Sequence, residues 1–204
     1  FQGWTNSGFD NYLVTPNPRT HRLLTRLAVE NLFHPFQPFM IGQKLLAPKV
    51  AALMDIQLIF YGENEAEYGN PIADNETSLR EKSFYTYKNI DQTYLGGLTL
   101  KELIKNHNIN IKDIETYLPL NDNEFKNSKI EVHYLGYYLK WTPQEAYYYA
   151  VENTGFKPRP YRSQGTFSRY SSIDDKIDDL HYYTTFIKFG IGRATSDASQ
   201  EIRS

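Results

Sequence analysis

The first quarter of the chain contains one short continuous apolar run and two stretches in which apolar residues recur at helical spacing. Residues 11–15 are a short apolar run closed by a Pro-Asn-Pro sequence, which predicts a strand followed by a turn. Leucines at helical spacing predict a helix over residues 21–33, with Thr20 as its N-cap. A second helical stripe runs through residues 45–54, where Pro48 predicts that the helix either begins later or kinks.

A continuous apolar run at residues 56–61 follows and is typical of a strand buried on both faces. The order strand, helix, helix, strand predicts an α/β fold with a Rossmann-like parallel sheet and flanking helices. Ligands of such sheets bind beyond the carboxyl ends of the strands. The residues after Tyr61 are therefore the first place where we expect chemistry.

The middle of the chain is polar and has no clear period. We expect residues 71–129 to form a polar and helical excursion, with short helices at 98–107 and 111–118. Residues 130–141 are rich in aromatic and branched side chains. They predict a second strand-like region, interrupted at Gly136.

The clearest helix signals come next. Thr142 is the predicted N-cap, with Pro143 at the first helical position. Glu145 completes a capping box with Thr142, and Gly155 lies just past the predicted end. A helix is therefore predicted between Pro143 and Gly155.

Residues 157–204 are expected to form a substrate and phosphate loop followed by C-terminal helices. A helix is predicted to start near Ser172, and its apolar residues keep to one face as far as Ile191. The chain does not begin with Met, and its last residues read as an interrupted helix. We therefore expect residues 1–204 to be a single-domain fragment of a longer chain.

Composition and charge narrow the classes of function. The 204 residues include 22 Lys and Arg and 24 Asp and Glu, and the formal net charge of −2 favours neither nucleic acid nor anionic membrane as a partner. Cysteine is absent, which excludes disulfides and thiolate metal sites here and fits a cytoplasmic protein. No apolar run is long enough to span a bilayer, and no secretory leader is visible. The 17 Tyr and 12 Phe suit an ordinary core, with a sugar-stacking cleft as the functional alternative.

Three carboxylates at alternating positions follow the strand predicted at 56–61, at Glu63, Glu65 and Glu67. With Asn64 they suit Mg²⁺ or a nucleotide, because Mg²⁺ takes a few carboxylate oxygens together with substrate phosphates. The flanking glycines allow close backbone approach. A solvated acidic turn is the structural alternative.

A basic loop carries Arg159, Arg162 and Arg169 together with Gly165 and Thr166. Guanidinium forks and backbone donors grip phosphates, and a loop that leads into a helix start strengthens this prediction. A mobile basic surface loop is the alternative.

Four aspartates lie near the start of the helix predicted from Ser172. Because residues i and i+4 are neighbours on a helix, Asp174 would pair with Asp178, and Asp175 with Asp179. One pair could hold a metal or orient a sugar amine, although acidic residues in a first turn also simply complement the helix dipole.

Two further features carry less weight. The glycines between residues 190 and 197 resemble a phosphate-cradling turn only weakly. Four histidines have no metal-ligand spacing and are expected to be structural: His21, His34, His107 and His133.

Taken together, these segments resemble the N-acetyl sugar amidotransferases of the PP-loop ATP pyrophosphatase group, which act in O-antigen, pseudaminic acid and legionaminic acid pathways. The resemblance is carried by HPFQPF at 34–39, FYGENEAEY at 60–68 and, above all, residues 165–203, which end in DDKIDDLHYYTTFIKFGIGRATSDASQEIR. It extends over nearly the whole chain.

The resemblance implies an adenine-nucleotide fold and a reaction in which ATP, with Mg²⁺, adenylates the amide oxygen of an acetamido sugar. Ammonia then displaces AMP and leaves an acetamidine. Subunits similar to the glutaminase and cyclase pair of histidine biosynthesis are expected to supply the ammonia. Adenylation converts the amide oxygen into a leaving group, so the protein must supply positioning and charge stabilisation.

The resemblance also implies roles for residues. Glu63, Asn64 and Glu67 match a nucleotide-side motif, with Glu63 and Glu67 expected to hold the metal. A downstream signature is expected to contact substrate, phosphate and nucleotide. Within it, Asp175 and Lys176 are expected to contact the sugar amide or the departing pyrophosphate. The matching residues are Arg162, Gly165, Thr166, Asp174, Asp175 and Lys176.

The chain departs from the family in two respects. The SGGxDS phosphate loop does not occur and would precede Phe1, and the family's N-terminal cysteines are missing. We therefore expect this fragment alone to lack activity.

Two other functions remain open. A PP-loop RNA-modifying enzyme would need a clustered basic face, against which the near-neutral charge argues. A noncatalytic carbohydrate-binding module would rely on the aromatic clusters instead.

Overall fold

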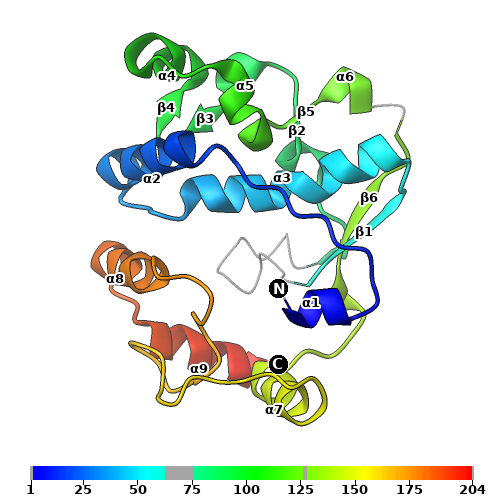
Figure 1. Cartoon of the computed structure of the whole chain (residues 1–204), viewed down its shortest axis with the longest axis vertical. Coiled ribbons are helices and arrows are strands. Elements are labelled where there is room, and N and C mark those ends of the chain that lie inside the picture. The colour runs from blue at the N-terminus through cyan, green and yellow to red at the C-terminus, as the bar shows by residue number, and fades with distance from the viewer. Residues whose placement is uncertain (1, 63–75, 126–127, 204) are drawn as a thin grey trace. The chain divides into compact units, whose positions relative to one another are not determined.

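The computed structural model describes residues 2–62, 76–125 and 128–203, which form two compact units (Figure 1). The central unit comprises Pro16–Lys140, and the terminal unit comprises Phe1–Thr15 with Trp141–Ser204. The strand expected at 11–15 is absent, and these residues are exposed coil.

Two long helices open the central unit. Helix α2 (Pro18–Leu32) is capped by Asn17, whose side chain accepts hydrogen bonds from the backbone N–H groups of Arg19 and Thr20. The prediction of Thr20 as the cap is therefore wrong, because Pro18 already occupies the first helical position.

Helix α3 (Gln37–Met54) is longer than its sequence pattern predicted, since it runs through Pro48 rather than beginning after it. Pro48 is fully buried, so packing of its ring offsets the backbone hydrogen bond that it cannot donate. Helix α3 packs against α2 and against the strand that follows.

Strand β1 (Leu58–Tyr61) pairs in parallel with β6 (Glu131–Tyr134), with Tyr61 opposite Tyr134. Only one face of β1 is buried: Ile59 is 8% exposed, whereas Leu58 and Phe60 are 51% and 48% exposed. The expectation of burial on both faces was therefore wrong. The backbone of Leu79 bridges to His133 on the other edge of β6.

Short elements fill the rest of the central unit, and they make the expected excursion more regular than its polarity indicated. Strand β2 (Thr86–Tyr87) pairs in parallel with β5 (Leu120–Asn121), and β3 (Tyr94–Leu95) forms a hairpin with β4 (Leu98–Thr99). The sheets of the described residues are thus two-stranded, and a larger Rossmann-like sheet stays a prediction. The remaining elements are η3 (Lys82–Phe84), η4 (Ile90–Gln92), α4 (Leu100–His107), α5 (Ile111–Ile114), η5 (Glu115–Tyr117), α6 (Asp122–Phe125) and η6 (Leu135–Tyr137).

The central unit contains two adjoining hydrophobic clusters. One joins α2 to α4 and η5 through Leu24, Leu103 and Tyr117, and the other joins α3 to β1 and β6 through Leu45 and Val132. Ile41 packs against both clusters, so α3 links the two halves of the core.

The terminal unit consists of helices and loops: α1 (Gln2–Asn6), α7 (Pro143–Asn153), α8 (Asp178–Phe189) and α9 (Arg193–Arg203). Its buried residues, among those described, are polar: Ser163, Thr166, Ser168, Ser172, Thr184 and Arg193. No helix in the described parts of the chain combines the length and apolar character needed to cross a bilayer.

Two helix starts in the terminal unit differ from the predictions. Thr142 makes no side-chain cap on α7, so the predicted capping box does not form. Helix α8 begins at Asp178 rather than near Ser172, and the left-handed backbone of Ser172, with φ of 54°, keeps that residue out of any helix.

Candidate functional site

The basic loop predicted from the sequence is closed by hydrogen bonds across its base. The backbone N–H of Arg159 donates to the carbonyl of Arg169 over 2.9 Å, and Arg169 Nε donates back to the carbonyl of Arg159 over 2.8 Å. Nearer the tip, the N–H of Ser163 donates to the carbonyl of Ser168 over 2.8 Å. Gly165 supplies the positive φ of 74° that the turn requires.

Two buried serines, Ser163 and Ser168, tie this loop to the segment after it. Ser163 Oγ donates to the carbonyl of Ser171, and Ser168 Oγ lies 2.8 Å from Ser171 Oγ. Arg159 donates to the carbonyl of Ser172. These bonds fix the chain from residue 159 to 172 without an apolar core, since buried hydroxyls that are paired cost little.

Arg193 at the start of α9 connects the segment after the loop to both C-terminal helices. It is 7% exposed, its Nη1 donates to Ser172 Oγ over 2.6 Å, and its Nε lies 3.7 Å from Asp197 Oδ2. Its guanidinium carbon stands 3.7 Å from the ring centroid of Tyr182 in α8. The guanidinium is planar and permanently charged, so it can make this hydrogen bond, ion pair and ring contact at the same time.

The residues of the loop that were predicted to contact phosphate differ in how exposed they are. Thr166 is buried, and its hydroxyl donates to Asp197, while the carbonyl of Gly165 accepts from the N–H of Ala194 over 3.0 Å. Of the three arginines, Arg159 and Arg169 bond to backbone carbonyls, whereas Arg162 is exposed. Arg162 and Arg169 are both exposed, but the guanidinium of Arg169 is bonded to the carbonyl of Arg159.

The segment from Asp174 to Lys176 precedes α8 and is not helical. Asp174 and Lys176 are exposed, and Asp175 Oδ1 accepts from the N–H of Ile177 over 2.9 Å. The predicted aspartate pairs therefore do not share a helix face, because only Asp178 and Asp179 lie in the first turn.

Burial and charge perturb two other side chains of this unit. Burial, with Arg193 and Lys188 nearby, lowers the pKa of His181, which favours its neutral form. Burial, with Glu201 and Asp197 nearby, raises the pKa of Tyr170 to about 12. Both rings therefore act as neutral packing groups near neutral pH.

A comparison with protein families bears on this segment. Residues 164–204 match the family "LPS biosynthesis protein WbpG-like, C-terminal domain". The matched stretch begins at the loop tip and includes Ser172, Arg193 and Asp197, so it contains most of the polar network described above. The C-terminal segment is thus similar to a domain of lipopolysaccharide biosynthesis proteins. No curated protein matches the chain.

The acidic run lies outside the described residues, so the expected roles of Glu63, Asn64 and Glu67 stay predictions. The parallel register does fix which strand ends adjoin: Tyr61 and Tyr134 are opposite each other, so Gly62 and Leu135 both leave the same edge of β1 and β6. Within the described ranges, no group of three or more His, Asp or Glu could hold a metal ion.

A hydrogen-bonded cluster that the sequence analysis missed lies along β6. His133 Nε2 lies 3.2 Å from Glu131 Oε2, and its Nδ1 lies 2.7 Å from the hydroxyl of Tyr138. That hydroxyl also lies 2.9 Å from Ser78 Oγ. The imidazole ring is thus held at both nitrogens, by a carboxylate at Nε2 and by a hydroxyl at Nδ1.

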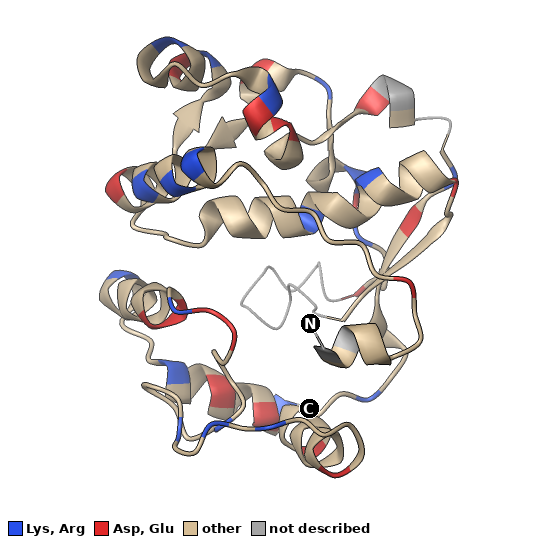
Figure 2. Ribbon diagram, viewed as in Figure 1, with Lys and Arg blue, Asp and Glu red and all other residues tan. Residues whose placement is uncertain are grey.

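The spacing of Glu131, His133 and Tyr138 gave no such signal, because Ser78 reaches them only through the backbone pairing of residues 78–80 with β6. Positive and negative side chains both occur in each unit (Figure 2).

Proposed function

We propose that this chain is part of an ATP-dependent amidotransferase of lipopolysaccharide biosynthesis, which converts the acetamido group of a nucleotide-linked sugar into an acetamidino group. The match of residues 164–204 to a lipopolysaccharide biosynthesis domain carries the proposal. The resemblance of FYGENEAEY and of the C-terminal signature to sugar amidotransferases supplies the reaction.

The proposed reaction has two steps. The amide oxygen of the sugar attacks the α-phosphorus of ATP, and pyrophosphate leaves. Ammonia then adds to the activated carbon, AMP leaves with the former amide oxygen, and loss of protons gives the acetamidine. The ammonia would come from glutaminase and cyclase-like partner subunits.

Particular residues would share this work. Carboxylates are the protein ligands that Mg²⁺ prefers, so Glu63 and Glu67 would hold the metal that neutralises phosphate charge, with Asn64 beside the nucleotide. The exposed Arg162 would contact phosphate, and Asp175 with Lys176 would contact the sugar amide or the pyrophosphate. Asp174, Gly165 and Thr166 would shape this loop and its approach to the nucleotide.

The polar network of the terminal unit gives these roles a physical basis. Arg159, Ser163 and Arg193 hold the loop through hydrogen bonds to its own backbone and to Ser172. A loop fixed in this way positions its exposed side chains before substrate binds, and such positioning is a large part of catalysis in transfers of this type.

The test uses the full-length enzyme with ATP, Mg²⁺, ammonium and a nucleotide-linked acetamido sugar, and mass spectrometry detects replacement of the amide oxygen by NH. We expect Glu63→Gln and Asp175→Asn each to abolish the product while circular dichroism stays unchanged. Glu152→Gln, on the exposed face of α7, is the control and should retain full turnover. Undiminished turnover in both Glu63→Gln and Asp175→Asn would reject the assignment.

A further inference from the structure

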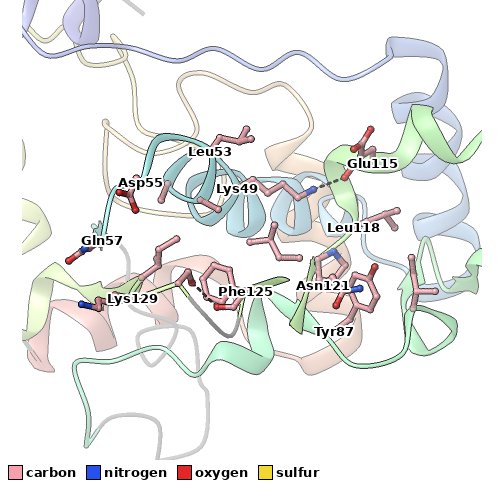
Figure 3. A pocket seen from close by; sticks show the side chains of 17 residues that line it. Lys49, Leu53, Asp55, Gln57, Tyr87, Glu115, Leu118, Asn121, Phe125 and Lys129 are labelled. Carbon is pink, nitrogen blue, oxygen red and sulfur yellow. Dashed lines mark hydrogen bonds between the residues drawn. The ribbon is translucent and has the colours of Figure 1, made fainter. Parts of the chain in front are cut away.

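The central unit holds a pocket of about 550 Å³ between α3 and the chain around β5 and α6 (Figure 3). Gln57 and Ile130 line it just before β1 and β6 begin, so it lies at the amino ends of these strands. Gly62, which precedes the acidic run in the sequence, leaves the opposite end of β1. Tyr87 and Asn121 line the pocket at the carboxyl ends of β2 and β5, a common place for ligands of parallel strands.

The floor of the pocket is apolar. Leu118, Phe125 and Ile130 line it and are only 8%, 3% and 3% exposed. A floor of this kind binds the hydrocarbon part of a ligand, and a pocket of several hundred cubic ångströms suits a small organic molecule.

Lys49 supplies the charge inside the pocket. Its Nζ donates to the carbonyls of Glu115 and Thr116 over 2.5 and 3.2 Å, and Figure 3 shows the side chain reaching from α3 toward Glu115. Carbonyls therefore hold this ammonium, and a lysine has three donors, of which two are used within the described residues. Burial lowers the pKa of Lys49 to about 8, although Glu115 opposes the shift.

The other charged residues of the pocket are Asp55, Glu115 and Lys129, and all three are exposed. Water and salt screen exposed charges more strongly than a half-buried one. The least screened charge of the pocket is therefore the positive charge of Lys49, even though the four charged side chains sum to zero.

We propose that this pocket is a binding site for a small organic carboxylate with an apolar body. The carboxylate pairs with Lys49 Nζ, and the body lies on Leu118, Phe125 and Ile130. Tyr87 and Asn121 lie at the end near Leu118 and offer polar contacts to the ligand (Figure 3). The site does not depend on the amidotransferase reaction proposed above.

Phenylbutyrate and its neutral isostere phenylbutyramide are the probes, titrated into the full chain and followed by calorimetry and by NMR. We expect the acid to bind at least about tenfold more tightly than the amide, because only the acid pairs with the half-buried ammonium. Lys49→Met should reduce the affinity for the acid to that for the amide. Lys105→Met, an exposed lysine on α4, is the matched control and should change neither value.

The pH dependence gives a second readout. Binding of the acid should weaken as the pH rises through about 8, where Lys49 loses its proton, while binding of the amide stays constant. Equal affinities for acid and amide, an unchanged affinity in Lys49→Met, or no binding of the acid at millimolar concentration would each overturn the proposal.

Discussion

At the scale of single residues, Arg193 joins α9 to α8 and to the segment that precedes α8. It bonds to Ser172, faces Tyr182 and pairs with Asp197, which also accepts from Thr166. The sequence drew attention to residues 190–197 only through their glycines. Asp197 lies one turn along α9 from Arg193, but Ser172 and Tyr182 come from two other segments, so local spacing could not reveal those two contacts.

Arg193→Met tests this role. Methionine replaces the aliphatic stem of arginine with a side chain of similar length but leaves Ser172 and Asp197 without their cation. We therefore expect a loss of about 2 to 3 kcal/mol in the free energy of unfolding. Arg203→Met is the control, since Arg203 lies on the same helix but is exposed, and its effect should stay within about 0.5 kcal/mol. Urea unfolding followed by fluorescence measures both, and equal effects would contradict the role given to Arg193.

At the scale of elements, the sequence predicted most helices correctly but not how their ends are capped. Proline at the first position and glycine past the end are local signals, and α7 and Gly155 follow them. The cap of α7 is not local, because Glu201 in α9 accepts from the N–H of Gln144 over 3.0 Å, in place of Thr142. The predicted candidate site gave a similar result: its segments could be recognised from the sequence, whereas the burial of Thr166 depends on its contact with Asp197 in α9.

The hairpin between β3 and β4 gives a test of one tight element. Gly96 and Gly97 both have positive φ, and a Cβ on Gly97 would stand 2.7 Å from Asn31 Cβ in α2. Gly97→Ala should therefore cost about 2 kcal/mol or more, from the left-handed backbone and from the clash. A loss below about 0.5 kcal/mol, measured by urea unfolding and circular dichroism, would contradict this packing.

Gly42→Ala is the matched control in the same unit, and it is expected to raise the free energy of unfolding rather than lower it. Gly42 lies inside α3, and its added Cβ would meet the ring of Tyr117 at an ordinary 3.5 Å. Alanine is a better helix former than glycine, so this change should stabilise the protein by about 0.5 to 1 kcal/mol.

At the scale of the whole molecule, the two units have different kinds of interior. The buried hydrophobic residues of the described chain all belong to the central unit, whereas the buried residues of the terminal unit are hydroxyl groups and Arg193. Hydrophobic burial is the dominant stabilising contribution in folding, while each net hydrogen bond contributes about 1 kcal/mol. The composition of the chain, averaged over both units, hides this contrast.

We therefore expect the terminal unit to open at lower denaturant concentration than the central unit. Hydrogen exchange with mass spectrometry in increasing urea should show peptides from α8 and α9 losing protection before peptides from α2 and α4. Simultaneous loss of protection in all four helices would instead mean that the chain unfolds in one step.

The division into two units also decides what optical probes report. Both tryptophans of the chain, Trp4 and Trp141, belong to the terminal unit, and the central unit has none. Indole emission excited at the red edge thus reports the terminal unit alone, without labelling. Following this emission in urea therefore isolates the opening of the terminal unit, whereas circular dichroism reports the helices of both units together.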